Sequence, residues 1–423
     1  MKQPAFAEPT AVVIGKSLLG TSQVYLHGKA APTNDDPGAC DDLSLQDAIV
    51  DSTSFFPYVV GVVPLNCDFE PSYRQSRRLP RVVGLSKFNP PLSSNMVRTR
   101  IVCVSDTHGY GPPDGAFKLP KGDVLIHAGD LSNQGSSSEL RKAVEWIENA
   151  DFEAKIVIAG NHDITLDSDF YDKNWASFHN QAQESTDECK SLFSNSSSII
   201  YLNHESATIR LSNPDGPRTV FKIFGSPYSP AWGKWAFSYS PEEAPSLWSQ
   251  IPADTDVVLT HTPPHSHRDK NEHGSLGCEY LRQALWKIRP RLAVCGHVHD
   301  GRGYDRVRWD LEPQSEPFME LSSTTGELPP RGSKKQSLID LTGRVQPRLD
   351  NDGSLSSPSS ISTANDASIQ DTARELGGAI GSSGRNETCI VNAAIMATNW
   401  PHRGGKKFNA PLVVDLDLPV YQE

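Results

Sequence analysis

The feature that most constrains this chain of 423 residues is a series of short apolar runs, each followed at once by histidine, aspartate or asparagine in a polar segment. Runs of this length and composition are typical of buried strands, and helical patterns lie between some of them. Strands are expected at 100–104, 123–127, 155–159, 199–202, 207–211, 219–224, 256–260, 291–295, 388–394 and 411–415, and helices at 136–149, 241–249 and 276–288. This alternation predicts a layered α/β fold, in which ligand sites form beyond the carboxyl ends of strands.

Five polar segments at strand ends carry side chains of the types that bind metals in proteins. They are Asp106-Thr107-His108, Gly129-Asp130, Gly160-Asn161-His162-Asp163, Thr260-His261 and Gly296-His297-Val298-His299. Any one histidine among them has a plainer interpretation, as a strand-end residue hydrogen-bonded to the backbone. All five segments together, with glycines that let the backbone approach closely, favour a shared metal site. Mixed imidazole, carboxylate and amide ligands suit Mn, Fe or Zn better than Mg or Ca.

These segments resemble the signature of the calcineurin-like metallophosphoesterase superfamily, which runs D-x-H, G-D-x-x-D, G-N-H-D/E, H and G-H-x-H. The spacing agrees, since Asp130 lies 24 residues after Asp106 and Asn161 lies 31 residues after Asp130. A closer resemblance is to the metallophosphoesterase-domain-containing (MPPED-like) group. It is carried by segments 123–130, 155–162, 225–227, 259–264 and 413–416, and it covers about 97–310 and 386–419.

The resemblance implies a fold and a metal centre. The fold is a β-sandwich with flanking helices, of the αββα type. One divalent ion would be held by Asp106, His108, Asp130 and His299, and a second by Asp130, Asn161, His261 and His297. Asp130 would bridge the two ions. Their charge exceeds that of the two aspartates, so the site would attract a phosphate dianion although the chain is acidic.

The resemblance also implies hydrolysis of phosphate esters by a metal-activated hydroxide, with His162 as the general acid that protonates the leaving oxygen. Asp163 has two open interpretations, because it could orient His162 or cap the next turn. The sequence departs from the signature at Asn133, where many relatives carry a second aspartate that orients and charges the acid histidine. Asn133 adds no charge, so acid catalysis is expected to be weaker.

A phosphodiester substrate is expected, because segments 130–135 and 162–165 lack the arginines that grip a dianion. The aromatic stretch 228–235 could stack on a base or aryl group, or simply pack on the core. Phosphomonoester hydrolysis is one alternative, and a low-turnover regulatory or scaffold protein that retains the metal site is another. Arg268 and Arg302 could contact phosphate or be ordinary surface arginines.

Four further histidines are assigned no metal. His127 is expected to pack on its strand and support the site from behind. The others, His265, His267 and His273, are expected in a polar loop, near substrate or exposed to solvent.

Composition divides the chain into three parts. Residues 1–95 are rich in Pro, Ser, Asp and Gly and are expected to be poorly ordered. Residues 96–311 and 386–423 should form the metallophosphoesterase domain. Residues 312–385, which contain a serine-rich tract at 354–360, are expected to be a disordered insertion within it.

Charge and cysteine content bear on partners and compartment. A net charge of −11 argues against binding a nucleic-acid polymer and leaves a small-molecule phosphate ester as the expected partner. No signal peptide and no membrane span are evident. Seven cysteines without a CxxC pair favour a reducing compartment, so a soluble cytoplasmic protein is expected. The oligomeric state stays open.

Overall fold

A computed structural model describes residues 95–351, 384–398 and 401–421, all within one compact unit, Arg78–Glu423. The expectations for 1–94 and for 352–383 lie outside the described residues.

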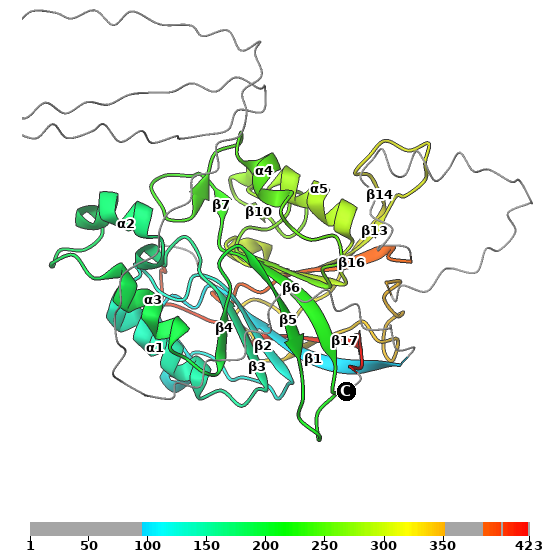
Figure 1. Ribbon diagram of the computed structural model, residues 1–423, viewed down its shortest axis with the longest axis horizontal. Coiled ribbons are helices and arrows are strands. Elements are labelled where there is room, and N and C mark those ends of the chain that lie inside the picture. Colours follow the sequence, from blue (N-terminus) through cyan, green and yellow to red (C-terminus); the bar gives the residue numbers. More distant parts are fainter. Residues whose placement is uncertain (1–94, 352–383, 399–400, 422–423) are drawn as a thin grey trace, which may run out of the picture. The chain divides into compact units, whose positions relative to one another are not determined.

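Two large sheets organise the described part of the chain (Figure 1). The first runs in the order β15 (Ser337–Asp340), β17 (Leu412–Pro419), β1 (Met96–Val104), β2 (Val124–Ala128), β3 (Ala154–Ile158) and β4 (Ile199–Tyr201). The second runs in the order β14 (Glu320–Thr325), β13 (Gly303–Trp309), β16 (Glu387–Asn392), β12 (Leu292–Cys295), β9 (Val257–Thr260), β6 (Val220–Ser226) and β5 (Glu205–Arg210). Two small ribbons pair β7 (Ser229–Pro230) with β8 (Ser238–Tyr239) and β10 (Lys270–Asn271) with β11 (Gly274–Ser275).

Helices cover the outer face of each sheet (Figure 1). They are α1 (Ser137–Glu148), α2 (Ser168–Asn174), α3 (Thr186–Ser194), α4 (Ala244–Trp248) and α5 (Glu279–Ile288). Helix α1 begins as its sequence predicts, because Ser136 and Glu139 form a capping box that satisfies backbone N–H groups of the first turn. Helices α2 and α3 were not expected, since each is short and polar. No helix among the described residues has the length and apolar character needed to cross a membrane.

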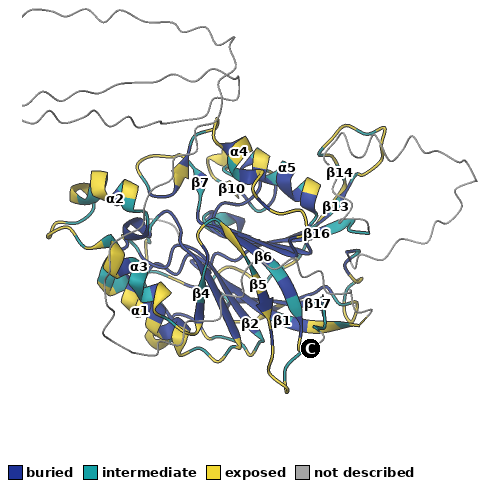
Figure 2. Ribbon diagram, in the orientation of Figure 1, coloured by how far each residue is buried: buried dark blue, intermediate teal, exposed yellow. Residues whose placement is uncertain are grey.

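The inner strands, such as β2, β3, β9 and β12, are buried on both faces because each sheet is packed on both sides (Figure 2). In β1, Ile101 and Cys103 point into the core between the two sheets, whereas Val102 and Val104 belong to the core beneath α1 and α3. A third core lies between the second sheet and helices α4 and α5, and contains the buried Trp248. The four layers confirm the predicted αββα sandwich.

One predicted boundary is wrong. Residues 312–351 were assigned to a structureless insertion, but they carry β14 and β15. Strand β15 pairs in parallel with β17, and Ile339, Leu341 and Leu349 are buried in the core between the sheets. The four-residue strand was missed because its neighbours are rich in proline, serine and charge. The structured chain therefore continues to Asn351, whose amide donates to the Arg289 and Glu387 carbonyls.

Candidate metal centre

The predicted ligands come together from the ends of five strands in two sheets. Asp106 and His108 follow β1, Asp130 follows β2, and Asn161 follows β3. His261 follows β9, and His297 and His299 follow β12 of the second sheet. Because β1, β2 and β3 are parallel, as are β9 and β12, these loops leave their sheets at the same edge. The side chains form two adjoining groups.

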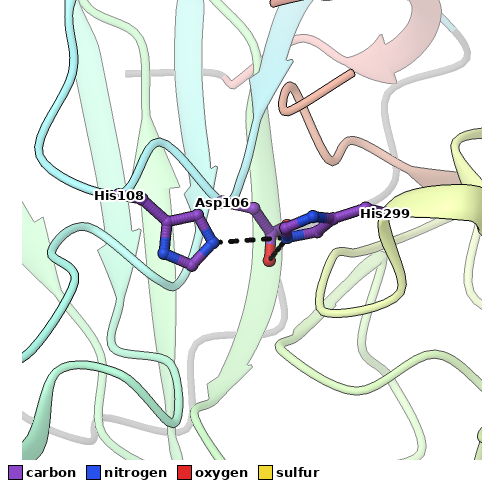
Figure 3. A group of neighbouring side chains, drawn as sticks. All are labelled: Asp106, His108 and His299. Carbon is purple, nitrogen blue, oxygen red and sulfur yellow. Dashed lines mark hydrogen bonds and ion pairs between the residues drawn. The ribbon is translucent and has the colours of Figure 1, made fainter. Parts of the chain in front are cut away.

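The first group contains Asp106, His108 and His299, whose side chains point toward one another (Figure 3). The Nε2 atoms of His108 and His299 are 3.2 Å apart. Asp106 Oδ1 lies 3.5 Å from His299 Nε2, and Asp130 Oδ2 lies 3.8 Å from His108 Nε2.

The second group contains Asn161, His261 and His297. Asn161 Oδ1 lies 2.9 Å from His261 Nε2 and 2.8 Å from His297 Nδ1, and these two nitrogens are 3.2 Å apart. The other oxygen of Asp130, Oδ1, lies 3.4 Å from His261 Nε2. Each carboxylate oxygen of Asp130 therefore faces a different group, so Asp130 would be available as a ligand to both.

The atoms that converge are acceptors. His261 Nδ1 lies 2.8 Å from the Ala128 carbonyl and His108 Nδ1 lies 3.3 Å from the Ser132 carbonyl. A carbonyl only accepts hydrogen bonds, so each Nδ1 carries a proton, and in the neutral ring Nε2 presents a lone pair to the centre. Two nitrogens bound tetrahedrally to one ion at about 2.1 Å lie about 3.4 Å apart, close to the separations in both groups. The residues therefore fit divalent metals.

Electrostatics favour the same conclusion. Burial lowers the pKa of His108 to about 3 and that of His297 to about 4, so both rings are neutral at physiological pH. Burial would raise the pKa of Asp130, but His261, His162 and His108 hold it well below its usual value. For His261 burial is likewise outweighed, by Asp130, and the pKa rises to about 9. A proton on His261 and a metal ion compete for one lone pair.

The backbone is strained where it presents these side chains. Asp106, His108, Asp130 and His297 have φ angles of 56°, 46°, 55° and 66°, in the left-handed region that costs non-glycine residues energy. Close approach also requires glycine. Gly129 has φ 93°, and a Cβ there would lie 2.6 Å from both the Ala159 carbonyl and His261 Nδ1. Strain held by the surrounding sheets is typical of a functional site.

Two buried side chains brace the loops. The carboxylate of Asp163 accepts hydrogen bonds from the Leu131, Ser132 and Gly160 amides, and so ties the loop after β2 to the loop after β3. Its two expected roles, orienting His162 or capping a turn, are both replaced by this one. Asn392, at the end of β16, donates to the Arg268, Gly296 and Val298 carbonyls and so supports the loop that carries His297 and His299. Its sequence signal was an amide residue within the otherwise apolar run 389–394.

His162 lies at the rim. Its Nδ1 is 2.7 Å from the backbone carbonyl of Asn133, so the missing aspartate is replaced by a main-chain oxygen. The amide group of Asn133 donates instead to the His108 carbonyl and to Glu139. On its other side the His162 ring lies 4.0 Å, centroid to centroid, from the ring of Trp235. Part of the aromatic stretch 228–235 thus packs against the site.

Of the other predicted residues, His127 lies as expected, whereas His267 and the two arginines do not. His127 is fully buried and bonded to Thr107 Oγ1, as expected of a strand histidine. His267 is not in an open loop: it is 2% exposed and lies between Asp305 and Glu320. Arg268 is engaged with Asp305, and Arg302 donates to the Ala394 and Ala410 carbonyls. Neither arginine is placed to serve as a dedicated phosphate ligand.

Comparison with known proteins identifies relatives of this chain. The profile of the family described as calcineurin-like phosphoesterase matches residues 99–301. A protein of Emericella nidulans named probable rhamnogalacturonate lyase C is 42% identical over 230 residues, which are 54% of this chain and 19% of that protein. Metallophosphoesterase domain-containing protein 1 of Homo sapiens is 37% identical over 218 residues, 48% of this chain and 62% of that protein. A UPF0046 protein of Caenorhabditis elegans is 30% identical over 252 residues, 57% of this chain and 81% of that protein.

The matched part of the chain spans less than two thirds of the first two relatives. Among solved structures, the purple acid phosphatase PPD1 of Lupinus luteus is 13% identical, covers 58% of this chain and 42% of its own, and has a TM-score of 0.28, too low to carry an argument. The worm relative is matched over most of its length, and the profile spans all five ligand-bearing segments. This chain belongs to the calcineurin-like phosphoesterase family, within its metallophosphoesterase-domain-containing group.

Proposed function

We propose that the protein hydrolyses phosphate esters at a dinuclear metal centre. Asp106, His108, Asp130 and His299 would hold one ion, and Asp130, Asn161, His261 and His297 the other. The observation that carries the proposal is the position of Asp130, whose two oxygens face different groups of converging acceptors. Two divalent ions, when bound, supply Lewis-acid chemistry and a water of lowered pKa.

The second part of the proposal assigns His162 as general acid. Because the Asn133 carbonyl fixes the proton on Nδ1, the remaining nitrogen, Nε2, is the one that can pass a proton to a leaving oxygen. His162 is half-buried, whereas Asp106 and Asp130 are buried, so it stands on the side from which substrate approaches. A competing role exists, since one nitrogen of His162 clusters with ligand atoms of His108 and Asp130.

For the substrate we favour a phosphodiester. No arginine occurs in segments 130–135 or 162–165, and Arg268 and Arg302 are committed to other partners. A diester carries one charge fewer than a monoester dianion and needs less cationic grip. Trp235, whose ring lies 4.0 Å from that of His162, is an aromatic neighbour for an aryl or base substituent bound beside His162. Phosphomonoester hydrolysis, and a low-turnover role that retains the metals, are the alternatives.

The test is metal analysis combined with a substrate panel. Purified protein should contain two transition-metal ions per chain, lose activity on chelation, and regain it with Mn. Under Mn, kcat/KM should be compared for bis-nitrophenyl phosphate, nitrophenyl phosphate and cyclic nucleotides. More than about tenfold preference for the monoester would reassign the enzyme as a phosphomonoesterase. Full activity of the metal-free protein would refute the metal centre.

The proposed setting is the cytoplasm, with a small phosphate ester as partner and no nucleic-acid polymer. Among the described residues five cysteines are buried and unpaired: Cys103, Cys189, Cys278, Cys295 and Cys389. Burial raises the pKa of Cys389 to about 12, so its thiol is protonated and unreactive. Buried thiols of this kind are compatible with a reducing compartment. Fractionation of cells with an antibody to the protein would test the location.

A further inference from the structure

A lysine from a distant part of the chain lies beside the loops that follow β1 and β2. Lys406 Nζ lies 3.2 Å from Asn133 Oδ1 and 4.7 Å from the ring centroid of Tyr110. The side-chain amide of Asn133 in turn donates to the backbone carbonyl of His108, and the backbone carbonyl of Asn133 accepts from His162 Nδ1. The ammonium of Lys406 is therefore one residue away from a predicted metal ligand and from the predicted general acid.

We propose that Lys406 is a phosphate-binding residue of this site, and that its ammonium contacts a non-bridging oxygen of the phosphoryl group. The inference deepens the proposed function and rests on it. Lys406 would supply, from the segment 401–408, the cation that segments 130–135 and 162–165 lack.

The chain is shaped to hold Lys406 in this place. At the base of its segment Met396 pairs with Phe408, and the Ala397 amide donates to the Lys407 carbonyl at 2.7 Å. Phe408 packs on Tyr110, two residues beyond His108, with ring centroids 5.1 Å apart. Just before Lys406, Gly404 and Gly405 have φ angles of 86° and 89°, a reversal that other residues adopt only with strain.

The charges around Lys406 leave it suited to an anion. Its hydrogen bond to Asn133 is the only one that its ammonium makes to a described residue, and that partner is neutral. Burial lowers the pKa of Lys406, opposed by the more distant Glu139. A partly desolvated ammonium with a neutral partner gains more from an anionic oxygen than a fully solvated one does.

The same segment reaches the rim of the metal centre through Asn133, which contacts Lys406 with its side-chain oxygen and His162 with its backbone carbonyl. His162, His297 and His299 are the half-buried members of the centre, which makes this side the entrance. An ester that enters beside His162 would lie near Lys406, because both side chains contact Asn133.

The experiment measures binding of inorganic phosphate to the full, metal-loaded chain by calorimetry, with metal content determined on each sample. Lys406→Gln should weaken phosphate binding by about tenfold, the loss expected for one charge-assisted hydrogen bond, and Lys406→Arg should restore most of it. Lys407→Gln is the matched control, since it removes the same charge from an exposed neighbour, and should stay within about twofold of wild type.

Phosphate binding separates this inference from the proposed function. If no ester is hydrolysed but phosphate still binds in a Lys406-dependent manner, the phosphate site stands and the activity is refuted. Unchanged phosphate affinity in Lys406→Gln overturns the inference, even where kcat falls, because a residue that merely positions Asn133 would behave in that way. Loss of phosphate affinity together with loss of metal overturns it as well.

Discussion

Two buried polar clusters of the domain follow opposite electrostatic rules. In the metal centre, imidazole, carboxylate and amide acceptors face one another, as at His261 and Asn161, on a strained backbone. In the second cluster, His267 lies between Asp305 and Glu320, and Arg268 and Arg282 complete the ion pairs. With Glu279, which also pairs with Arg282, this second cluster is balanced: three carboxylates face three cations, and it needs no further ion. The first gathers imidazole nitrogens, carboxylate oxygens and an amide oxygen at short distances from one another, which is the arrangement that a metal cation completes.

The largest expected effect is on the shared carboxylate. Asp130→Asn should remove both metals and reduce hydrolysis to the rate of metal-free protein, because both groups lose a charged ligand. Asn161→Ala touches only the second group and should cost less. The matched control is Asp305→Asn in the balanced cluster, which should cost about 3–5 kcal/mol of unfolding free energy with metal content unchanged. Metal analysis and denaturant titration measure both. Equal metal contents in wild type and Asp130→Asn would break the comparison.

The next largest effect is expected for His162, which lies at the rim of the metal centre. If His162 is a proton donor and not a ligand, His162→Ala should keep its metals and slow esters of poor leaving groups by about 10²–10⁴-fold. Nitrophenyl esters, whose leaving groups need less protonation, should suffer less. Rates measured across a series of leaving groups decide the point. A uniform loss, accompanied by loss of metal, would make His162 a member of the acceptor cluster.

The balanced cluster around His267 should make the free energy of unfolding depend on pH. Burial would lower the pKa of His267, but hydrogen bonds and charge from Asp305 and Glu320 raise it to about 9. Because the folded-state pKa exceeds the unfolded value of 6.5, the stabilisation is complete below pH 6.5 and is lost as pH rises toward 9. The change amounts to about 3 kcal/mol in the free energy of unfolding. Urea titrations between these pH values should show this decline, and His267→Gln should abolish it.

The smallest expected effect is from the chain outside both clusters. Removal of residues 352–383 should leave thermal stability and specific activity nearly unchanged. A deletion that continues back through 322–351 should not be tolerated, because it removes Ile339 from the core between the sheets. The single change Ile339→Ala should itself cost about 2–4 kcal/mol. Melting curves test all three variants. Inactivity of the shorter deletion, with normal melting, would show that 352–383 contributes to the site.

The centre was more predictable than its supports. Strand-end motifs marked Asp106, Asp130 and His261 because short, local patterns determine both the strand and the polar residue that follows it. The partners of Asn133 and His267 could not be predicted, since they depend on segments that meet only in the folded chain. Lys406 illustrates the limit: it looks like any lysine in a basic turn until Asn133, a long way back in sequence, is seen 3.2 Å away.

The pairing of the first and last described strands in the sequence has a consequence for biosynthesis. Strand β1 pairs antiparallel with β17, Met96 opposite Pro419, and Arg100 bonds to Asp415, 315 positions later. During translation β1 leaves the ribosome long before its partner exists, so one edge of an apolar strand waits unpaired while the rest of the domain is made. Such non-local pairing slows folding and leaves the nascent chain prone to aggregation. The protein is thus expected to depend on chaperones during synthesis more than its compact native state suggests.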